Sequence, residues 1–252
     1  MNNSNELLYE VADGIATITI NRPEARNALN TAVRNGIRES LELFSQDSLA
    51  KVLIITGAGD VAFSAGADLK EMANQKITIP EPDFISDLKT AKPVIAAVNG
   101  LAFGGGFFLV QSADLVIAAE HATFGITEAR HGRGAPWAAP LPLLIAPRVA
   151  LELLLTAEPI SAARAKEVGL INSVVPASEL MQTSRVIAQQ IAANAPLSVA
   201  AGKAMVHSVI EGVLGDAGQS AKAIWEPVYL SDDAQEGPLA FKEKRAPNWQ
   251  GR

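Results

Sequence analysis

The sequence predicts a layered α/β fold with a helical C-terminal region. Before residue 120, short apolar runs alternate with segments of helical periodicity, and several of these runs end in glycine or asparagine. From about residue 148 onward the pattern is helical. Apolar runs of this length are typical of strands in a parallel sheet, which requires helices to cover its faces.

The expected strands follow one another along the N-terminal half. Residues 14–21 alternate apolar residues with threonines, the period of two that a half-buried strand shows. Residues 51–57 and 92–100 are apolar runs that end in glycine, as expected of strands buried on both faces. Residues 114–119 are expected to form a further strand.

The first helix is expected to begin after Asn30, whose side chain is suited to cap it. Val33, Ile37, Leu41 and Phe44 then recur on one face, with polar residues between them. This spacing predicts an amphipathic helix that packs against the strands. A second, short apolar helix is expected over residues 107–113.

The C-terminal half is predicted to be a series of helices separated by prolines. The helical segments are residues 149–155, 161–168, 178–194, 196–211, 215–229 and 232–245, and the prolines are Pro159, Pro176, Pro196 and Pro227. We expect a core over residues 1–195 and a C-terminal helical region over residues 196–252 that serves in oligomerisation or as a lid. A proline-containing segment over residues 77–84 is expected to be mobile surface.

The composition argues against several classes of function. The 252 residues are 48% hydrophobic and 19% charged, which supports a soluble protein with a large core. A net charge of -6 argues against nucleic acid as a partner. The absence of cysteine excludes disulfides, thiolate metal sites and a cysteine nucleophile. With a polar start and no apolar run of about 18 residues, we expect a cytoplasmic protein with no membrane partner.

Two glycine-containing stretches, residues 63–72 and 100–106, lie where the pattern changes from strand to helix. Each is suited to present bare backbone N–H groups at a helix N-terminus. Two such ends, with Ala67 and Gly105 as donors, form an oxyanion hole for a thioester that becomes an enolate. The alternatives are an ordinary turn before a helix capped by Asp68, and a glycine that allows close packing.

Other common motifs are not supported. The glycine run is not a dinucleotide fingerprint, because residue 109 is leucine. A serine hydrolase elbow around Ser64 would require glycine where residue 62 is alanine. The sequence contains no H-E-x-x-H pattern, so no metal site is expected.

Glu128 is the candidate acid/base group. It follows an apolar strand and precedes a loop interrupted by glycines, so it is either a partly buried carboxyl with a raised pKa or a surface residue. His131 has an assisting or a structural role, and Arg133 is a surface charge or meets an acidic group of a ligand. Trp137 is expected in the core or in a pocket wall.

Taken together, these residues resemble the enoyl-CoA hydratase/isomerase, or crotonase, superfamily. The matching segments are residues 20–23, 27–30, 63–70, 92–100, 104–106, 113–118, 123–125 with Glu128, 160–165, 169–170, 174–176, 236–237 and 241–245. The resemblance implies a spiral of ββα turns with a helical C-terminal region. It also implies assembly as a homotrimer or a dimer of trimers.

The resemblance also implies roles for individual residues. Ala67 and Gly105 match the oxyanion-hole positions, and Glu128 matches the second of the two hydratase glutamates. The segments that border the CoA pocket match Arg26, Ala28, Ala65, Gly66, Asp68, Leu69 and Lys70. The implied substrate is an acyl-CoA thioester, and no metal or further cofactor is expected because CoA enters as part of that substrate.

The sequence departs from the hydratases at two places. Phe108 stands where the first hydratase glutamate is expected, and residues 132–138 lack the Gly-x-Pro-Gly-x-Gly-Gly pattern. An acyl-CoA enzyme of hydratase type is the leading hypothesis. One carboxylate with an oxyanion hole also suits an enoyl-CoA isomerase. A C–C bond hydrolase of β-diketones and a non-catalytic acyl-CoA-binding relative remain as alternatives.

Overall fold

The computed structural model describes residues 5–72 and 90–252, so the segment at residues 77–84 lies outside the described residues. Its larger sheet has the strand order β1-β2-β3-β5-β7-β10. These strands are β1 (Leu7–Ala12), β2 (Ile15–Ile20), β3 (Val52–Gly57), β5 (Val94–Val98), β7 (Leu115–Ala119) and β10 (Ser173–Val175). Only β1 runs antiparallel to its neighbour, and the other pairs are parallel.

A smaller sheet has the order β4-β6-β8-β9. Its strands are β4 (Ala62–Ser64), β6 (Leu101–Phe103), β8 (Thr123–Gly125) and β9 (Ile160–Ser161). The chain visits the two sheets in turn: β3 leads to β4, β5 to β6 and β7 to β8, each pair followed by a helical segment. The expected spiral of ββα turns is therefore confirmed.

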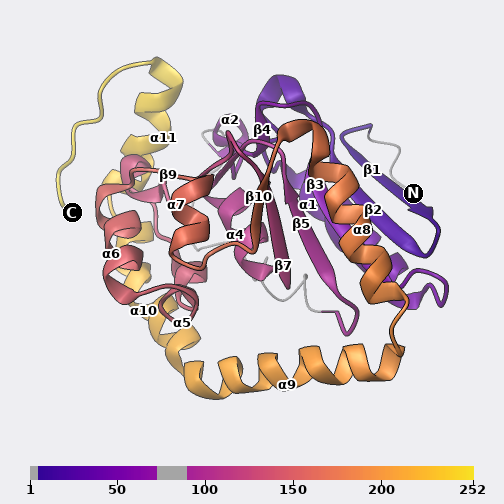
Figure 1. Cartoon of the computed structure of the whole chain (residues 1–252). Coiled ribbons are helices and arrows are strands. Elements are labelled where there is room, and N and C mark those ends of the chain that lie inside the picture. The colour runs from indigo at the N-terminus through magenta and orange to yellow at the C-terminus, as the bar shows by residue number, and fades with distance from the viewer. Residues whose placement is uncertain (1–4, 73–89) are drawn as a thin grey trace.

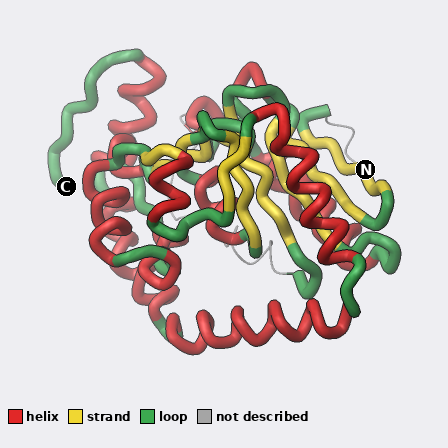
Figure 2. The backbone as a smooth tube through the Cα atoms, viewed as in Figure 1, coloured by secondary structure: helices red, strands yellow, loops and turns green. Residues whose placement is uncertain are grey.

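The helices surround these sheets (Figure 1; Figure 2). They are α1 (Thr31–Gln46), α2 (Leu69–Met72), α4 (Gly105–Ser112), α5 (Leu141–Leu144), α6 (Pro147–Thr156), α7 (Ala162–Glu167), α8 (Leu180–Ala192), α9 (Pro196–Leu214), α10 (Ala217–Leu230) and α11 (Asp233–Glu243). Short 3-10 helices are η1 (Pro23–Ala25), η2 (Glu128–His131), η3 (Pro136–Ala138) and η4 (Ala177–Glu179).

The apolar runs are buried on both faces of the larger sheet, as predicted. Leu53 and Ile55 of β3 point into a core that includes α1 and the smaller sheet. Ile54, between them, points into a second cluster beneath α8, which lies across the other face in Figure 1. The predicted cap of α1 is also confirmed, because the Asn30 side chain accepts a hydrogen bond of 2.9 Å from the N–H of Val33.

Three local expectations were wrong or incomplete. The region after residue 148 is not wholly helical, since β9 and β10 lie within it. Pro227 does not separate helices but lies inside α10. Strand β1 was not anticipated. Strands of two or three residues, such as β9 and β10, carry no readable period and exist because a neighbouring strand pairs with them. The contacts of α10 with η3 and α11 outweigh the local preference of proline.

Helix α9 extends along one edge of the molecule and joins α8 to α10 (Figure 1). By length and composition it could cross a membrane, so the expectation that no apolar stretch of about 18 residues occurs was wrong. None of that stretch is buried in the chain. Its polar residues anchor it to the sheet: Lys203 Nζ lies 2.7 Å from Asp114 Oδ2, and His207 Nε2 lies 2.9 Å from Asp114 Oδ1.

Two buried asparagines hold the turn that leads from β3 to β4. Asn27 donates to the carbonyl oxygens of Ala58 and Ala62, at 2.9 and 2.7 Å. Asn99 donates to the carbonyl oxygen of Gly59 at 2.8 Å and accepts from the N–H of Gly57 at 3.1 Å. Because β4 leads directly into the first glycine-containing stretch, these amides determine where that stretch lies.

The Asn27→Ala variant is expected to be about 3 kcal/mol less stable to unfolding, because buried carbonyl groups lose their donors. Urea denaturation followed by circular dichroism measures the difference. The matched control is Asn194→Ala at an exposed position, with an expected change within about 0.5 kcal/mol. Equal stability of the two variants would show that Asn27 does not support this turn.

Candidate active site

The two glycine-containing stretches lie against each other. Ala67 follows β4, and Gly105 begins α4. A Cβ atom built on Gly105 would lie 3.7 Å from the backbone nitrogen of Ala67. A Cβ on Gly66 would lie 3.0 Å from the nitrogen of Gly105 and 2.7 Å from the carbonyl oxygen of Phe103. Contact this close explains why residue 66 is glycine.

Glycine is also required inside α4. A Cβ on Gly106 would overlap the carbonyl oxygen of Ser64. Gly66 additionally has a φ of +87°, which side chains rarely adopt. The glycines therefore bring two backbone turns closer together than any side chain would permit.

This arrangement leaves two N–H groups unused. Within residues 5–72 and 90–252, neither the Ala67 nor the Gly105 N–H has a hydrogen-bond acceptor. Their neighbours are paired: the Gly66 carbonyl accepts from Leu29 at 2.8 Å, and the Gly104 N–H donates to Gly125 at 3.0 Å. Gly105 lies in the first turn of α4, where the helix dipole favours negative charge. The geometry suits an oxyanion.

Glu128 brings a carboxyl group to the same place. It begins η2, just after β8, and its Oε1 lies 3.2 Å from the position of a Cβ on Gly104. Although the residue as a whole is half-buried, its Oε2 is buried and has no hydrogen-bond partner among the described residues. Of the two readings left open by the sequence, the buried carboxyl is correct.

Burial raises the pKa of Glu128 to about 7. Backbone N–H groups, a hydrogen bond from the Trp137 side chain and the charge of Arg133 act in the opposite direction but do not offset the burial. A carboxyl group with this pKa is partly protonated at neutral pH. It is therefore suited both to accept and to donate a proton.

An aromatic wall stands beside this carboxyl. The Phe108 side chain, at the position expected for a first glutamate, is 2% exposed, and its ring centroid lies 5.8 Å from that of Trp137. The Phe107 ring lies 5.9 Å from the same indole. Trp137 is thus both a core residue and a neighbour of Glu128, so the site has an apolar side where a second carboxylate would stand.

The neighbouring charged residues have other contacts. Arg130 forms an ion pair of 2.6 Å with Glu158. His131 packs edge-on against Phe241 of α11, with ring centroids 5.9 Å apart, and burial lowers its pKa. The Arg133 guanidinium lies 5.3 Å from the centre of the Tyr229 ring of α10. The C-terminal helices therefore enclose the segment that carries Glu128.

The residues expected to border a CoA pocket come from two segments that are brought together. The Arg26 carbonyl accepts a hydrogen bond of 2.9 Å from the Ala65 N–H. Ala28 and Gly66 are buried, Ala65, Asp68 and Leu69 are half-buried, and Arg26 and Lys70 are exposed. The carboxylate of Asp68 is already engaged, since it accepts from Arg22 at 3.0 Å and from the N–H groups that begin α2. Their binding role stays a prediction.

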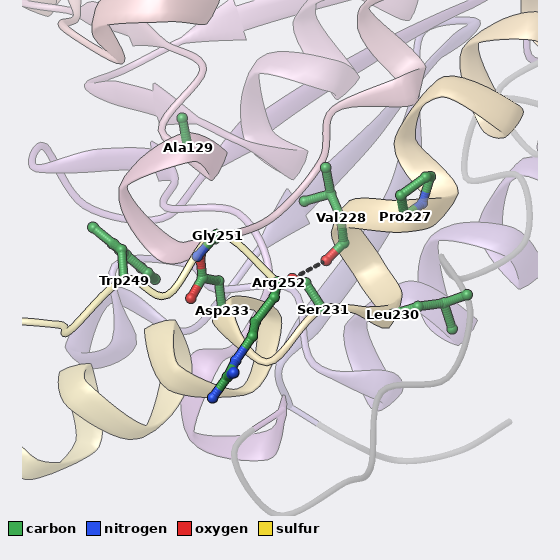
Figure 3. A pocket seen from close by; sticks show the side chains of 10 residues that line it. Ala129, Pro227, Val228, Leu230, Ser231, Asp233, Trp249, Gly251 and Arg252 are labelled. Carbon is green, nitrogen blue, oxygen red and sulfur yellow. Dashed lines mark hydrogen bonds between the residues drawn. The ribbon is translucent and has the colours of Figure 1, made fainter.

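A hollow lies beside this site, on the other side of η2. A cavity of about 680 Å³ lies between η2, the junction of α10 and α11, and the C-terminal tail (Figure 3). Ala129 and Trp249 line it, and Asp233 there accepts hydrogen bonds from the N–H groups of Gln250 and Gly251. Neither Glu128 nor the unpaired N–H groups line this cavity, so we do not assign the chemistry to it.

Sequence analysis missed three residues around the site. Arg22 joins Asp68 to the carbonyl of Ala28, Tyr229 donates to the Gly134 carbonyl at 2.8 Å, and Gln111 donates to the Trp137 carbonyl at 2.9 Å. Gln111 alone carried a signal, as a polar residue within an otherwise apolar run. No cluster of three or more possible metal ligands occurs among the described residues.

The raised pKa of Glu128 predicts a pH-dependent stability. Unfolding lets the carboxyl lose its proton near its ordinary pKa of 4.5, so rising pH between about 4.5 and 7 favours the unfolded state. Relative to Glu128→Gln, the wild-type free energy of unfolding is expected to fall by about 3 kcal/mol between pH 4 and pH 8. Urea denaturation at both pH values tests this, and a constant difference would contradict the burial.

Comparison with known proteins gives a consistent result. Residues 10–252 match the family model described as enoyl-CoA hydratase/isomerase. The chain is 39% identical to the carnitinyl-CoA dehydratase of Salmonella typhi, over 98% of this chain and 99% of that protein. It is also 39% identical to a solved carnitinyl-CoA hydratase from Mycobacterium avium, with a TM-score of 0.89 over 99% of this chain and 100% of that one.

A further solved structure, the enoyl-CoA hydratase from Mycobacterium tuberculosis H37Rv, is 34% identical to the chain. Its TM-score is 0.82, over 90% of this chain and 100% of that chain. The matches span almost the full length of the chain and include both the glycine-containing turns and η2. The chain belongs to the enoyl-CoA hydratase/isomerase family and is an acyl-CoA enzyme of the crotonase superfamily.

Proposed function

We propose that the protein adds water to the double bond of a 2-enoyl-CoA thioester, or removes it from the 3-hydroxyacyl form, with Glu128 as the acid/base group. The observation that carries the proposal is the Glu128 carboxyl, buried against the turn that begins at Gly104, with a pKa of about 7. The hydratase and dehydratase names of the relatives support the same reaction class.

In the direction of hydration, the Glu128 carboxylate takes a proton from water while the water oxygen bonds to the β carbon. The electrons of the double bond move onto the thioester oxygen, which becomes an enolate. The N–H groups of Ala67 and Gly105 stabilise this charge, each by roughly 3 kcal/mol. The protonated Glu128 then gives a proton to the α carbon. One carboxyl on one face of the substrate thus serves as both base and acid.

The binding of CoA is proposed to follow the family. Arg26 and Lys70 are exposed beside the turn that ends at Ala67, where cationic side chains are suited to meet phosphate groups. Ala28, Ala65 and Gly66 would form the backbone wall along which the rest of CoA passes. The mechanism needs no metal and no cofactor other than the CoA that the substrate carries.

A second candidate reaction is double-bond isomerisation. The observation that favours it is Phe108, a buried aromatic residue where a second carboxylate would stand. Here Glu128 would remove a proton from the α carbon and return it to the γ carbon, with the same N–H groups holding the dienolate. Water would not be added, so the two reactions differ in the mass of their products.

Assembly is proposed to use the exposed face of α9. Leu197, Met205, Val209 and Val213 are each at least 63% exposed, a continuous apolar surface that is unusual for a free monomer. The ion pair between Lys203 and Asp114 holds the opposite side of the helix against the sheet. We propose a homotrimer or a dimer of trimers, in which this apolar face contacts another subunit.

The Glu128→Gln variant is expected to lose turnover by at least about a hundredfold, because it can no longer exchange a proton. The assay incubates 2-enoyl-CoA and 3-enoyl-CoA thioesters in deuterated water and follows the products by mass. Glu120→Gln, an exposed glutamate at the end of β7, is the matched control and should retain full activity.

The mass of the products distinguishes hydration from isomerisation. A gain of one molecule of heavy water supports hydration, and migration of the double bond with deuterium uptake supports isomerisation. If neither water addition nor α-deuterium exchange depends on Glu128, both reactions are contradicted. A C–C bond hydrolase or a binding protein would then remain.

The Val209→Glu variant is expected to form smaller assemblies, because a charge would be buried in the proposed contact between subunits. Light scattering coupled to size-exclusion chromatography measures the mass. Leu49→Glu, which alters a leucine that is 75% exposed and lies outside α9, is the control and should keep the wild-type mass. An unchanged mass for Val209→Glu would contradict this interface.

A further inference from the structure

Helix α4 carries a polar side chain within its apolar sequence. Gln111 follows Phe108 by three residues, so both lie on the same face of the helix. The Gln111 Nε2 donates a hydrogen bond of 2.9 Å to the carbonyl oxygen of Trp137. The Phe108 ring packs against the indole of the same tryptophan. Gln111 therefore belongs to the aromatic wall beside Glu128.

The contact with Trp137 determines which way the amide points. A carbonyl oxygen only accepts hydrogen bonds, so the NH2 group of Gln111 must face it, and the amide oxygen must face away. The Oε1 of Gln111 is buried and has no hydrogen-bond partner among the described residues. An unpaired buried acceptor destabilises the folded protein, and folded proteins rarely leave one without a partner.

Trp137 lies between Gln111 and the Glu128 carboxyl. Its side chain lies close enough to Glu128 to act on the pKa of that carboxyl, its ring contacts Phe108, and its carbonyl oxygen accepts from Gln111. Gln111 lies six residues after Gly105, or roughly 9 Å along the helix axis at 1.5 Å per residue. Its side chain leans back over the preceding turn. For an acyl chain that runs along α4 from a thioester carbonyl held at Gly105, the acceptor would lie beyond the carbons next to that carbonyl.

We propose that Gln111 is a specificity-determining residue whose Oε1 accepts a hydrogen bond from a hydroxyl group carried by the acyl chain beyond its β carbon. The inference rests on the proposed function, because the thioester is placed by the N–H groups of Ala67 and Gly105. The substrate class is an acyl-CoA with a polar, uncharged group in the chain, rather than a plain alkyl chain.

The charge of Arg133 favours a neutral donor. Its guanidinium is close enough to Glu128 and Tyr229 for its charge to oppose the rise in pKa that burial causes in both groups. A cationic donor such as an ammonium group would enter this positive field unfavourably. A quaternary ammonium has no hydrogen to donate to Gln111. A hydroxyl group satisfies the acceptor without either difficulty.

The test compares two substrates of equal length, 2-hexenoyl-CoA and 6-hydroxy-2-hexenoyl-CoA. Wild-type protein is expected to prefer the hydroxylated substrate by at least about tenfold in kcat/KM, the equivalent of one hydrogen bond to an otherwise unpaired acceptor. Gln111→Leu should abolish or reverse that preference, measured as the ratio of the two kcat/KM values. Ser112→Ala is the matched control, since the Ser112 hydroxyl bonds to the Phe108 carbonyl of its own helix.

Two kinetic results would overturn the inference. An unchanged substrate ratio in Gln111→Leu would show that Gln111 only supports Trp137. An equal loss of water addition on both substrates, with α-deuterium exchange preserved, would show that Gln111 orients the attacking water instead. Thermal unfolding of each variant, with and without CoA, verifies that the fold is retained.

A binding measurement separates this inference from the proposed reaction. Calorimetry with hexanoyl-CoA and 6-hydroxyhexanoyl-CoA needs no turnover, so it applies even to a protein that converts neither substrate. Tighter binding of the hydroxylated compound that is lost in Gln111→Leu would support the recognition whatever the reaction. Equal Kd values for the two compounds with wild-type protein would overturn it.

Discussion

The close approach of two backbone turns is the constraint on which the rest of the structure depends. Gly66 and Gly106 allow the turn after β4 and the start of α4 to meet without side chains between them. The parallel pairing of β4 with β6 and the amides of Asn27 and Asn99 hold the turns in register. The result is two N–H groups that the protein itself does not use, and these are the groups that can stabilise a developing oxyanion.

Burial of Glu128 depends on parts of the chain far away in sequence. Helix α11 packs against η2 so closely that a Cβ on Gly237 would overlap the carbonyl of His131. Helix α10 contributes Tyr229, whose hydroxyl binds the loop after η2. These contacts remove water from around the carboxyl and raise its pKa, which changes an ordinary acidic side chain into one that exchanges protons near neutral pH. The C-terminal helices thus contribute to the chemistry as well as to the shape.

The side chains beside Glu128 are separate from the backbone that presents the two N–H groups. Phe108 and Trp137 form an apolar surface, and Gln111 adds a single acceptor to it. The backbone fold around these residues is shared with relatives that are similar over almost the whole chain. Under the proposed function, the acyl group would be selected by side chains on α4 and on the loop after η2, which are separate from the N–H groups of Ala67 and Gly105.

The sequence by itself determined the strands of the larger sheet from β2 to β7, the capped helix α1, and the glycine-containing stretches that present Ala67 and Gly105. These features depend on the spacing of apolar residues, on the residues that cap helices and form turns, and on the backbone conformations that glycine allows. All three are specified by residues that are close together in the sequence. Other features were decided only by the tertiary structure. These are strand β10, the position of Pro227 inside a helix, the burial of Glu128 and the orientation of the Gln111 amide. Each depends on a partner distant in the chain, because pairing, desolvation and hydrogen bonding are properties of what surrounds a residue rather than of the residue itself.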